Sequence, residues 1–265
     1  MFSLFQDISL VNERVIPLDE VQMISISYIS YSVSLYETNA SALILKEYFQ
    51  RSHTEDHAQV RIERKSITIQ QGSRRMASSK RGYVEIFLPK SFFGTLNVQT
   101  VSGKIESYSR IALDELNLSS TSGDIVLGDV MAGAAVLSTV SGSILAGTLR
   151  ASSSLHTISG SIHIDCAAGQ GEASTVSGAI SIEYEKVLGD IKASSTSGRV
   201  YMCLPPDQTY MLYAKSIHGK MRIAFDTKYL LTKNDALIGV IGGMKGNQSK
   251  VELSSVSGRI DLVYR

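Results

Sequence analysis

Serine hydroxyls next to glycine are the most frequent groups in this sequence that could carry covalent chemistry. The pair occurs in "TVSGKI" at Gly103, in "TISGSI" at Gly160 and in five further places. A nucleophilic serine requires one sharp turn, an adjacent base and an oxyanion hole, as in G-x-S-x-G. Here the same serine recurs seven times without a recurring histidine or acid. The pattern therefore predicts a structural repeat and no catalytic residue.

The segment "HTEDH" is the best candidate for metal ligation. His53 and His57 enclose Glu55 and Asp56, and on a helix both imidazoles would lie on one face, where they could bind a metal. The surrounding sequence does not clearly indicate a helix and points to no third ligand. We expect a solvated loop and predict neither a metal nor a cofactor.

A basic segment is the best local candidate for binding an anion or a partner. The stretch "QQGSRRMASSKRG" (70–82) carries Arg74, Arg75, Lys80 and Arg81 and reads as a mobile hairpin loop. Such a cluster could contact phosphate, an anionic lipid head group or an acidic protein. The alternative is a solvated loop that only aids solubility. Since no aromatic residues are interleaved, we predict no nucleic-acid partner.

The Ser-Gly pairs belong to a repeat that runs through the last two thirds of the chain. Successive corner glycines are separated by 18 to 21 residues, except for a final interval of 39, which predicts one repeat that has lost its signature. The corner glycines are Gly103, Gly123, Gly142, Gly160, Gly178, Gly198, Gly219 and Gly258.

Each repeat predicts two short strands that meet at the glycine. Apolar residues alternate with polar ones on both sides of it, as in Ile162 and Ile164, which indicates strands with one buried face. Such a unit cannot bury its own apolar face, so the units must stack, about 4.8 Å apart. We expect the glycine to provide a positive φ angle. The Thr or Ser three residues before it should form a ladder of hydroxyls. The direction of the residue two before it, such as Val176, is left open.

The first third lacks the repeat but remains rich in strand patterns. Segments 21–29, 31–36, 58–70 and 82–89 alternate apolar and polar residues. Segment 41–48 reads as a strand, with a short helix capped by Asn39 as the alternative. We predict an all-β, single-stranded β-solenoid of 18–21-residue coils at 96–265. Residues 1–95 should form an N-terminal β-strand cap, continuous with it, that covers its open edge.

Composition adds few constraints on partners. Lysine and arginine total 26 against 25 acidic residues, which gives no global field for nucleic acid or membrane. No apolar run has the length of a transmembrane helix, and the first residues lack a signal-peptide pattern. The sequence as given therefore predicts a cytoplasmic protein. Cys166 and Cys203 lie two repeats apart, beyond disulfide reach, and are expected to be small packing residues.

Four segments together resemble a known bacterial family. These are "LILKEYF" (43–49), "VEIFLPKSF" (84–92), "LNVQTVSGKI" (96–105) and "VELSSVSGRIDL" (251–262). With the repeated Ser-Gly pairs, they are similar to the bacterial "putative adhesin" β-strand-repeat domain of unknown function. The resemblance implies a repeat fold, a link to envelope-stress responses and envelope association, and it supplies no catalytic residues.

The leading hypothesis is a non-enzymatic module that presents a Ser/Thr-rich surface to a macromolecular partner, a protein or a component of the cell envelope. Self-association through a face or an end of the stack is a further expectation. The alternative is a glycan-binding or glycan-modifying β-helix protein. The scattered acids show no pair at the spacing that glycoside hydrolysis needs, so an enzyme is not expected.

Overall fold

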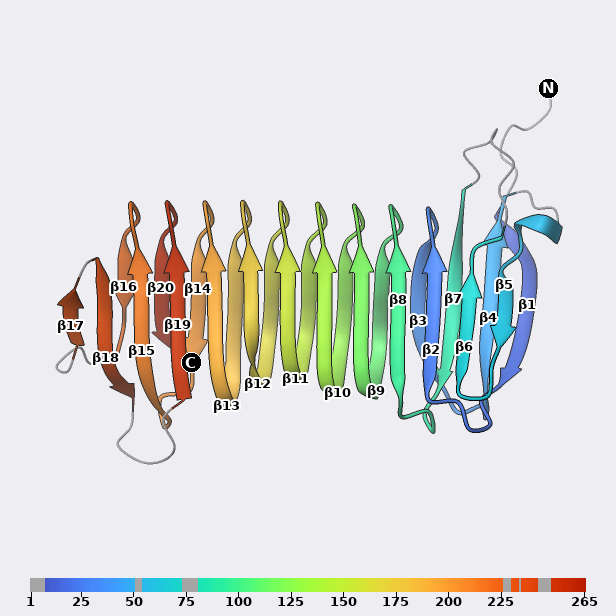
Figure 1. The fold of residues 1–265 in the computed structure, drawn as a ribbon, viewed down its shortest axis with the longest axis horizontal. Coiled ribbons are helices and arrows are strands. Elements are labelled where there is room, and N and C mark those ends of the chain that lie inside the picture. The colour runs from blue at the N-terminus through green and yellow to red at the C-terminus, as the bar shows by residue number, and fades with distance from the viewer. Residues whose placement is uncertain (1–7, 51–53, 73–80, 226–229, 234, 243–248) are drawn as a thin grey trace, which may run out of the picture.

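The computed structural model describes residues 8–50, 54–72, 81–225, 230–233, 235–242 and 249–265. These residues form an all-β fold. Within these ranges hydrogen bonds connect 20 strands into one sheet, which forms an elongated stack (Figure 1). The all-β class is confirmed, and the parallel repeating strands are those of a solenoid-like fold. Its only described helix is one 3-10 turn, so no described helix has the length to cross a membrane.

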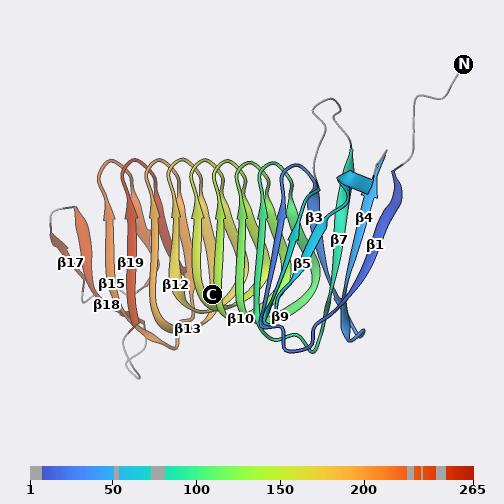
Figure 2. The same cartoon turned by 45° about the vertical axis from the view of Figure 1, so that its right-hand side comes forward.

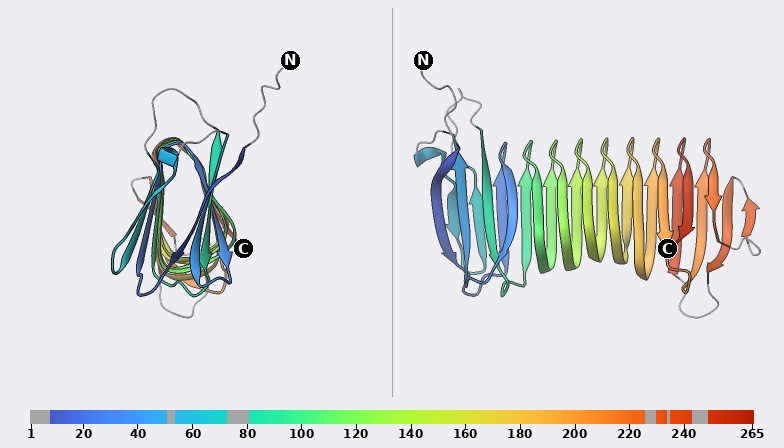
Figure 3. Two further views of the ribbon diagram at one scale, coloured as in Figure 1. Left: turned by 90° about the vertical axis from the view of Figure 1, so that its right-hand side faces the viewer. Right: turned by 180° about the vertical axis from the view of Figure 1, so that it is seen from behind.

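The centre of the stack consists of parallel strands, and each one after the first starts just after one corner glycine and ends just before the next. A bend in each strand lets the sheet form two walls, seen end-on in Figure 3. We call them the pre-corner wall and the post-corner wall. The central strands are β8 (Thr95–Thr100), β9 (Ile105–Ser120), β10 (Ile125–Thr139), β11 (Ile144–Thr157), β12 (Ile162–Thr175) and β13 (Ile180–Ser195).

The core is a stack of equivalent apolar side chains between the two walls. In the parallel register Ile125 pairs with Ile144, Ile144 with Ile162 and Ile162 with Ile180. All four are fully buried. The period-2 alternation of the sequence therefore predicted the buried face correctly, because successive side chains of a strand point to opposite sides.

The amino-terminal strands close one end of the stack (Figure 2). Strand β2 pairs in parallel with both β6 and β8, and β3 pairs in parallel with both β7 and β9. The segment β2–β3 thus lies between the first glycine repeat and the cap. The cap strands β1, β4 and β5 pair antiparallel. These elements are β1 (Ser9–Pro17), β2 (Met23–Tyr28), β3 (Ser32–Thr38), β4 (Ala42–Phe49), η1 (Thr54–Asp56), β5 (Gln59–Ile62), β6 (Ser66–Gln70) and β7 (Gly82–Pro89).

A buried carboxylate fastens this cap. Glu47 of β4 accepts hydrogen bonds from the Asn12 side chain (2.7 Å), the Tyr28 hydroxyl (3.0 Å) and the Ala58 backbone N–H (2.9 Å). It therefore ties together β1, β2 and the chain after η1. Burial and the neighbouring Glu47 carboxylate raise the pKa of Tyr28 well above its ordinary value. Residues 42–49 form a strand, so the strand reading of this segment is confirmed and the helix alternative is wrong.

At the carboxyl end the order of strands in space departs from the order in sequence. Strand β19 lies between β13 and β15, and β20 lies between β14 and β16. The intervening β17 and β18 form an antiparallel hairpin on β15. These strands are β14 (Val200–Leu204), β15 (Thr209–Ser216), β16 (Met221–Ile223), β17 (Leu230–Lys233), β18 (Ala236–Gly242), β19 (Ser249–Ser255) and β20 (Ile260–Tyr264).

This threading corrects one expectation. The interval of 39 residues between Gly219 and Gly258 does not contain a repeat without its signature. It contains the end hairpin β17–β18, after which the chain returns and inserts its last repeat between two earlier ones. The boundary between residues 95 and 96 stays a prediction, and β2 and β3 bond across it to β8 and β9.

Two isoleucines of one repeat test the inward register. Ile162 is fully buried, whereas Ile158 is 40% exposed. We expect Ile162→Ala to lower the free energy of unfolding by about 2–5 kcal/mol, because it leaves a cavity in the core. Ile158→Ala should change it by less than about 0.5 kcal/mol. Chemical denaturation of both variants measures this difference, and equal losses would contradict the register.

Candidate interaction surfaces

The corner glycines lie in one row, because each lies against the backbone of the neighbouring corner, and the turns between the strands line up along the upper edge of the stack in Figure 1. A Cβ at Gly123, Gly142, Gly160 or Gly178 would collide with the carbonyl oxygen of the preceding corner glycine. At the carboxyl end the row continues from Gly198 to Gly258 and then to Gly219, which matches the inserted repeat. The predicted alignment of the eight glycines is therefore observed.

The reason for glycine differs from the predicted one. Among the described glycines only Gly169, Gly171 and Gly242 have a φ in the positive region, and none of these is a corner residue. The corners need glycine because adjacent backbones approach too closely for a Cβ. The first corner of the row, in β2–β3, is occupied by Tyr31, whose carbonyl oxygen lies against Gly103. The Tyr31 ring stacks on Phe49 of the cap, with ring centroids 4.3 Å apart.

The hydroxyl three residues before each glycine is buried and bonds to backbone. The Thr157 hydroxyl donates to the Gly142 carbonyl (3.0 Å) and accepts the Gly160 N–H (3.1 Å). Thr139, Thr175 and Ser195 repeat this pattern. The predicted ladder of hydroxyls thus runs mainly from hydroxyl to corner backbone, which satisfies groups that a dry corner would leave unpaired. These hydroxyls are not part of the outer surface.

The residue two before each glycine points outward, which resolves the direction that the sequence left open. Val101, Val140, Val176 and Val256 are 40–44% exposed, and Ile158 and Ile217 are 40% and 49% exposed. The corner edge is therefore an apolar ridge, interrupted by Thr121 and Thr196.

The pre-corner wall carries a shallow polar depression of about 410 Å³ near its amino-terminal end. Its floor consists of two rows of side chains that follow the stack, with Ser27, Gln99, Ser119 and Ser138 in one row. In the other row the Asn117 amide donates to Asn97 (2.9 Å), and the Asn97 amide donates to Ser25 (3.3 Å).

These rows leave polar groups available to a partner. The hydroxyls of Ser27, Ser119 and Ser138 make no hydrogen bond within the described part of the chain, and all three side chains are half-buried. Further along the same wall lies a second depression of similar volume, lined by charged groups that include Glu172, Asp190, Lys192, Lys250 and Glu252. The pre-corner wall therefore offers hydroxyl and amide groups at one end and mixed charges at the other.

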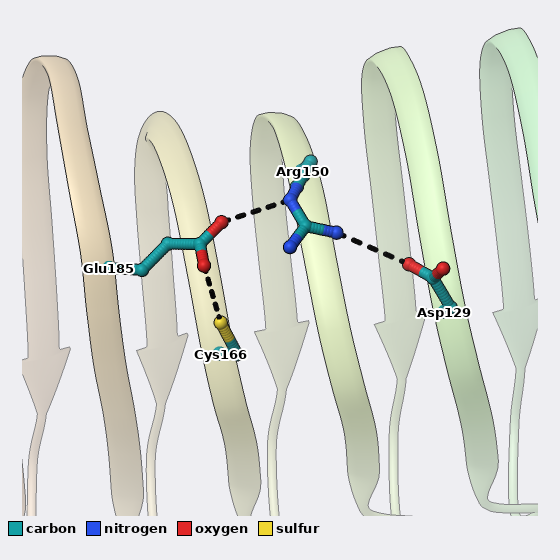
Figure 4. Close-up of polar contacts among 4 residues, drawn as sticks. All are labelled: Asp129, Arg150, Cys166 and Glu185. Carbon is teal, nitrogen blue, oxygen red and sulfur yellow. Dashed lines mark hydrogen bonds and ion pairs between the residues drawn. The ribbon is translucent and has the colours of Figure 1, made fainter.

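The post-corner wall carries a charged network that spans the four adjacent strands β10 to β13 (Figure 4). The Arg150 guanidinium contacts Glu185 through Nε (2.9 Å) and Asp129 through a terminal nitrogen (3.5 Å), and the Cys166 thiol donates to Glu185 (3.2 Å). The bond from Cys166 and the pairing with Arg150 lower the pKa of Glu185. Desolvation, followed by the bond to Glu185, raises the pKa of the Cys166 thiol. Cys166 is thus held as a thiol and is not an activated nucleophile.

The structure tests only some of the other candidate residues. Arg74, Arg75 and Lys80 lie outside the described residues, and so does His53. Arg81 is exposed just before β7. Within the described ranges no group of three or more histidine, cysteine or acidic side chains could hold a metal. Cys203 is buried and forms no disulfide with Cys166, as expected for a packing residue.

The two histidines of the fourth glycine repeat contact different residues on opposite walls. His156 bonds to Ser174 (2.7 Å) on the pre-corner wall, and His163 contacts Asp165 (2.8 Å) on the post-corner wall. The side chains of the seven corner serines bond to no histidine or carboxylate within the described residues. The geometry therefore gives them no base for nucleophilic chemistry.

Residues 21–263 match the family described as Toastrack DUF4097. The match spans nearly the whole of the two-walled stack. The chain belongs to the Toastrack DUF4097 family. The resemblance seen in the sequence is thereby confirmed, and the family description names no enzyme. Among curated proteins none matches this chain.

Solved bacterial structures share the Toastrack fold. A structure described as a "putative adhesin" from Parabacteroides merdae has a TM-score of 0.61 at 12% identity, with 96% of each chain covered. One so described from Parabacteroides distasonis has a TM-score of 0.57 at 12% identity and covers 97% of this chain and 98% of its own. A "putative adhesin" structure from Bacteroides fragilis has a TM-score of 0.53 at 13% identity, with 97% of each chain covered. At such identities the likeness shows the fold alone.

Substitution of a corner glycine should be far more costly than substitution of Gly147, a glycine within strand β11. In Gly160→Ala the new Cβ would collide with the Gly142 backbone, whereas in Gly147→Ala it would lie 3.0 Å from the Gly128 carbonyl oxygen. We expect Gly160→Ala to cost at least about 3 kcal/mol, a severe loss typical of overpacking, and Gly147→Ala about 1 kcal/mol or less. Denaturant unfolding measures both, and similar losses would contradict the role assigned to the corners.

The state of Cys166 can be measured by alkylation. In a Cys203→Ser background, iodoacetamide should modify Cys166 slowly at about pH 8, because its raised pKa leaves little thiolate. Glu185→Gln removes the bonded carboxylate, lowers the thiol pKa and should accelerate alkylation roughly threefold. The matched control is Glu183→Gln on the same strand. An unchanged rate in Glu185→Gln would show that Glu185 does not control the thiol.

Proposed function

We propose that this protein is a non-enzymatic interaction module, a β-solenoid whose pre-corner wall binds a macromolecular partner. The observation that carries the proposal is the polar depression across β2, β6, β8, β9 and β10. Its serine, asparagine and glutamine side chains repeat at the spacing of the strands, about 4.8 Å. A rigid row of donors and acceptors suits a partner that is itself extended and polar.

The contacts explain how the wall would bind. Polar groups that bond only to water can exchange water for a partner at little cost, because each hydrogen bond is replaced. Many such contacts along a rigid surface add up without ordering flexible segments. The partner in this proposal is a protein or a component of the cell envelope, and the role is regulation or assembly in envelope stress. The cytoplasm as the site of the protein, with envelope association, is part of the same proposal.

A second candidate is glycan binding at the same depression. Amide and hydroxyl side chains are the groups that pair with sugar hydroxyls, and the Asn97–Asn117 row supplies them. The lining of the depression contains no aromatic side chain among the described residues, so the stacking that many sugar sites use is missing from it. We therefore place glycan binding second.

Two charges introduced into the depression should abolish binding. Ser119 and Ser138 are half-buried outward residues, so Ser119→Arg/Ser138→Arg places bulk over the depression while leaving the core intact. Ser194→Arg is the matched control, since Ser194 occupies the equivalent position on β13, outside the depression. Wild type and control should retain one partner from native bacterial extract that the double variant loses.

The same three proteins applied to a glycan array separate the two candidates. A glycan that binds wild type and control but not the double variant would establish the second candidate. Turnover of a glycan would overturn the non-enzymatic assignment. Equal retention of the partner by all three proteins would exclude the depression as the binding surface.

A further inference from the structure

The carboxyl-terminal repeats gather basic side chains on the post-corner wall. Arg199, Arg259 and Lys220 each follow a corner glycine. They lie on adjacent segments of the stack, because the Val200 N–H donates to the Arg259 carbonyl (2.8 Å) and the Ile260 N–H donates to the Lys220 carbonyl (3.0 Å). Arg222 lies in the next row, paired in register with Asp261. The sequence does not suggest this cluster, because the inserted β20 is what places Arg259 between Arg199 and Lys220.

A buried carboxylate fixes the two arginines. Asp261 is 2% exposed, and its two oxygens each accept one bond of 2.7 Å, from Arg199 Nε and from Arg259 Nε. Both contacts use Nε, so each guanidinium is held at its inner nitrogen. The Arg199 guanidinium also lies 5.4 Å from the centre of the Tyr201 ring. Each guanidinium is therefore positioned before any ligand arrives, which reduces the entropy lost on binding.

The outer ends of these arginines remain open. The Arg199 and Arg259 side chains are 54% and 49% exposed, and their terminal nitrogens make no hydrogen bond within the described residues. Lys220 and Arg222 are exposed and form no ion pair there. Asp261 is the carboxylate that contacts the two arginines in this cluster of four cations. Arg150 differs, since it contacts one carboxylate through Nε and a second through a terminal nitrogen.

We propose that Arg199 and Arg259, held by Asp261, form a binding site for a phosphate group together with Lys220 and Arg222. Terminal guanidinium nitrogens donate charge-assisted hydrogen bonds to phosphate oxygens, often in pairs. The uncompensated positive charge of the cluster attracts the anion and compensates for its desolvation. The phosphate belongs either to a soluble phosphate compound or to an anionic lipid head group. The site lies on the opposite wall from the polar depression and near the other end of the stack, so it is independent of the proposed function.

Phosphate binding can be measured on the whole protein by titration calorimetry with inorganic phosphate. A second arm measures cosedimentation with phosphatidylcholine vesicles that contain phosphatidylglycerol. Lys220→Gln/Arg222→Gln leaves the bonds to Asp261 intact and should raise the Kd about tenfold or more, a loss of about 1.4 kcal/mol. Arg199→Lys/Arg259→Lys keeps the charge beside Asp261 but removes the planar fork, and it should weaken binding similarly.

The control variant is Lys186→Gln/Lys192→Gln, which removes two exposed lysines elsewhere and changes the net charge equally. Binding in both arms supports a lipid head group or a soluble phosphate of equal chemistry. Binding of phosphate alone supports a soluble compound, and binding of vesicles alone supports a lipid. Absence of binding in both arms overturns the proposal, and so does equal weakening in the control. Ser119→Arg/Ser138→Arg should leave phosphate binding unchanged, which separates this site from the depression.

Discussion

Adjacent backbones approach so closely at the corners that this contact sets the geometry of the whole stack. Each corner glycine lies so near the carbonyl oxygen of its neighbour that no Cβ fits between them. The buried Thr or Ser three residues earlier bonds to both corners, as Thr157 does with Gly142 and Gly160. These contacts fix the register of every repeat at one edge. Once that edge is aligned, the isoleucines inside and the polar rows outside must align as well.

The stack has two ends, and at each of them the strands depart from the order of the repeats. At the amino-terminal end β2 and β3 form an additional layer, beyond which antiparallel strands and the buried Glu47 complete the cap. At the other end β19 and β20 insert between earlier strands, and the β17–β18 hairpin pairs along the outer edge of β15. Exposed parallel edges would invite pairing with other chains, so antiparallel strands at the ends protect the stack.

The regular fold also determines what the surfaces can do. Alternation places one side chain of each repeat in the same outward row, so a change of residue type along a row creates a local surface without altering the core. The pre-corner rows are rich in serine and asparagine near β8 to β10, and the post-corner rows become basic at β14, β20 and β16. The Arg150 network differs, because its charges pair with one another within the wall.

The amino-acid sequence predicted the repeat, the all-β class and the buried face, since these follow from local spacing and from alternation within one strand. It predicted the row of corner glycines, although it gave positive φ as their reason when the cause is a neighbouring carbonyl. It could not reveal that Tyr31 takes a corner, because the side chain is accommodated there by a contact with the cap, in which its ring stacks on Phe49. Which repeats are neighbours depends on the threading of the folded chain. Repeats with the same pattern can pair with one another equally well by local rules, so the insertion of β20, and with it the meeting of Arg199, Arg259 and Asp261, depends on how the chain is threaded.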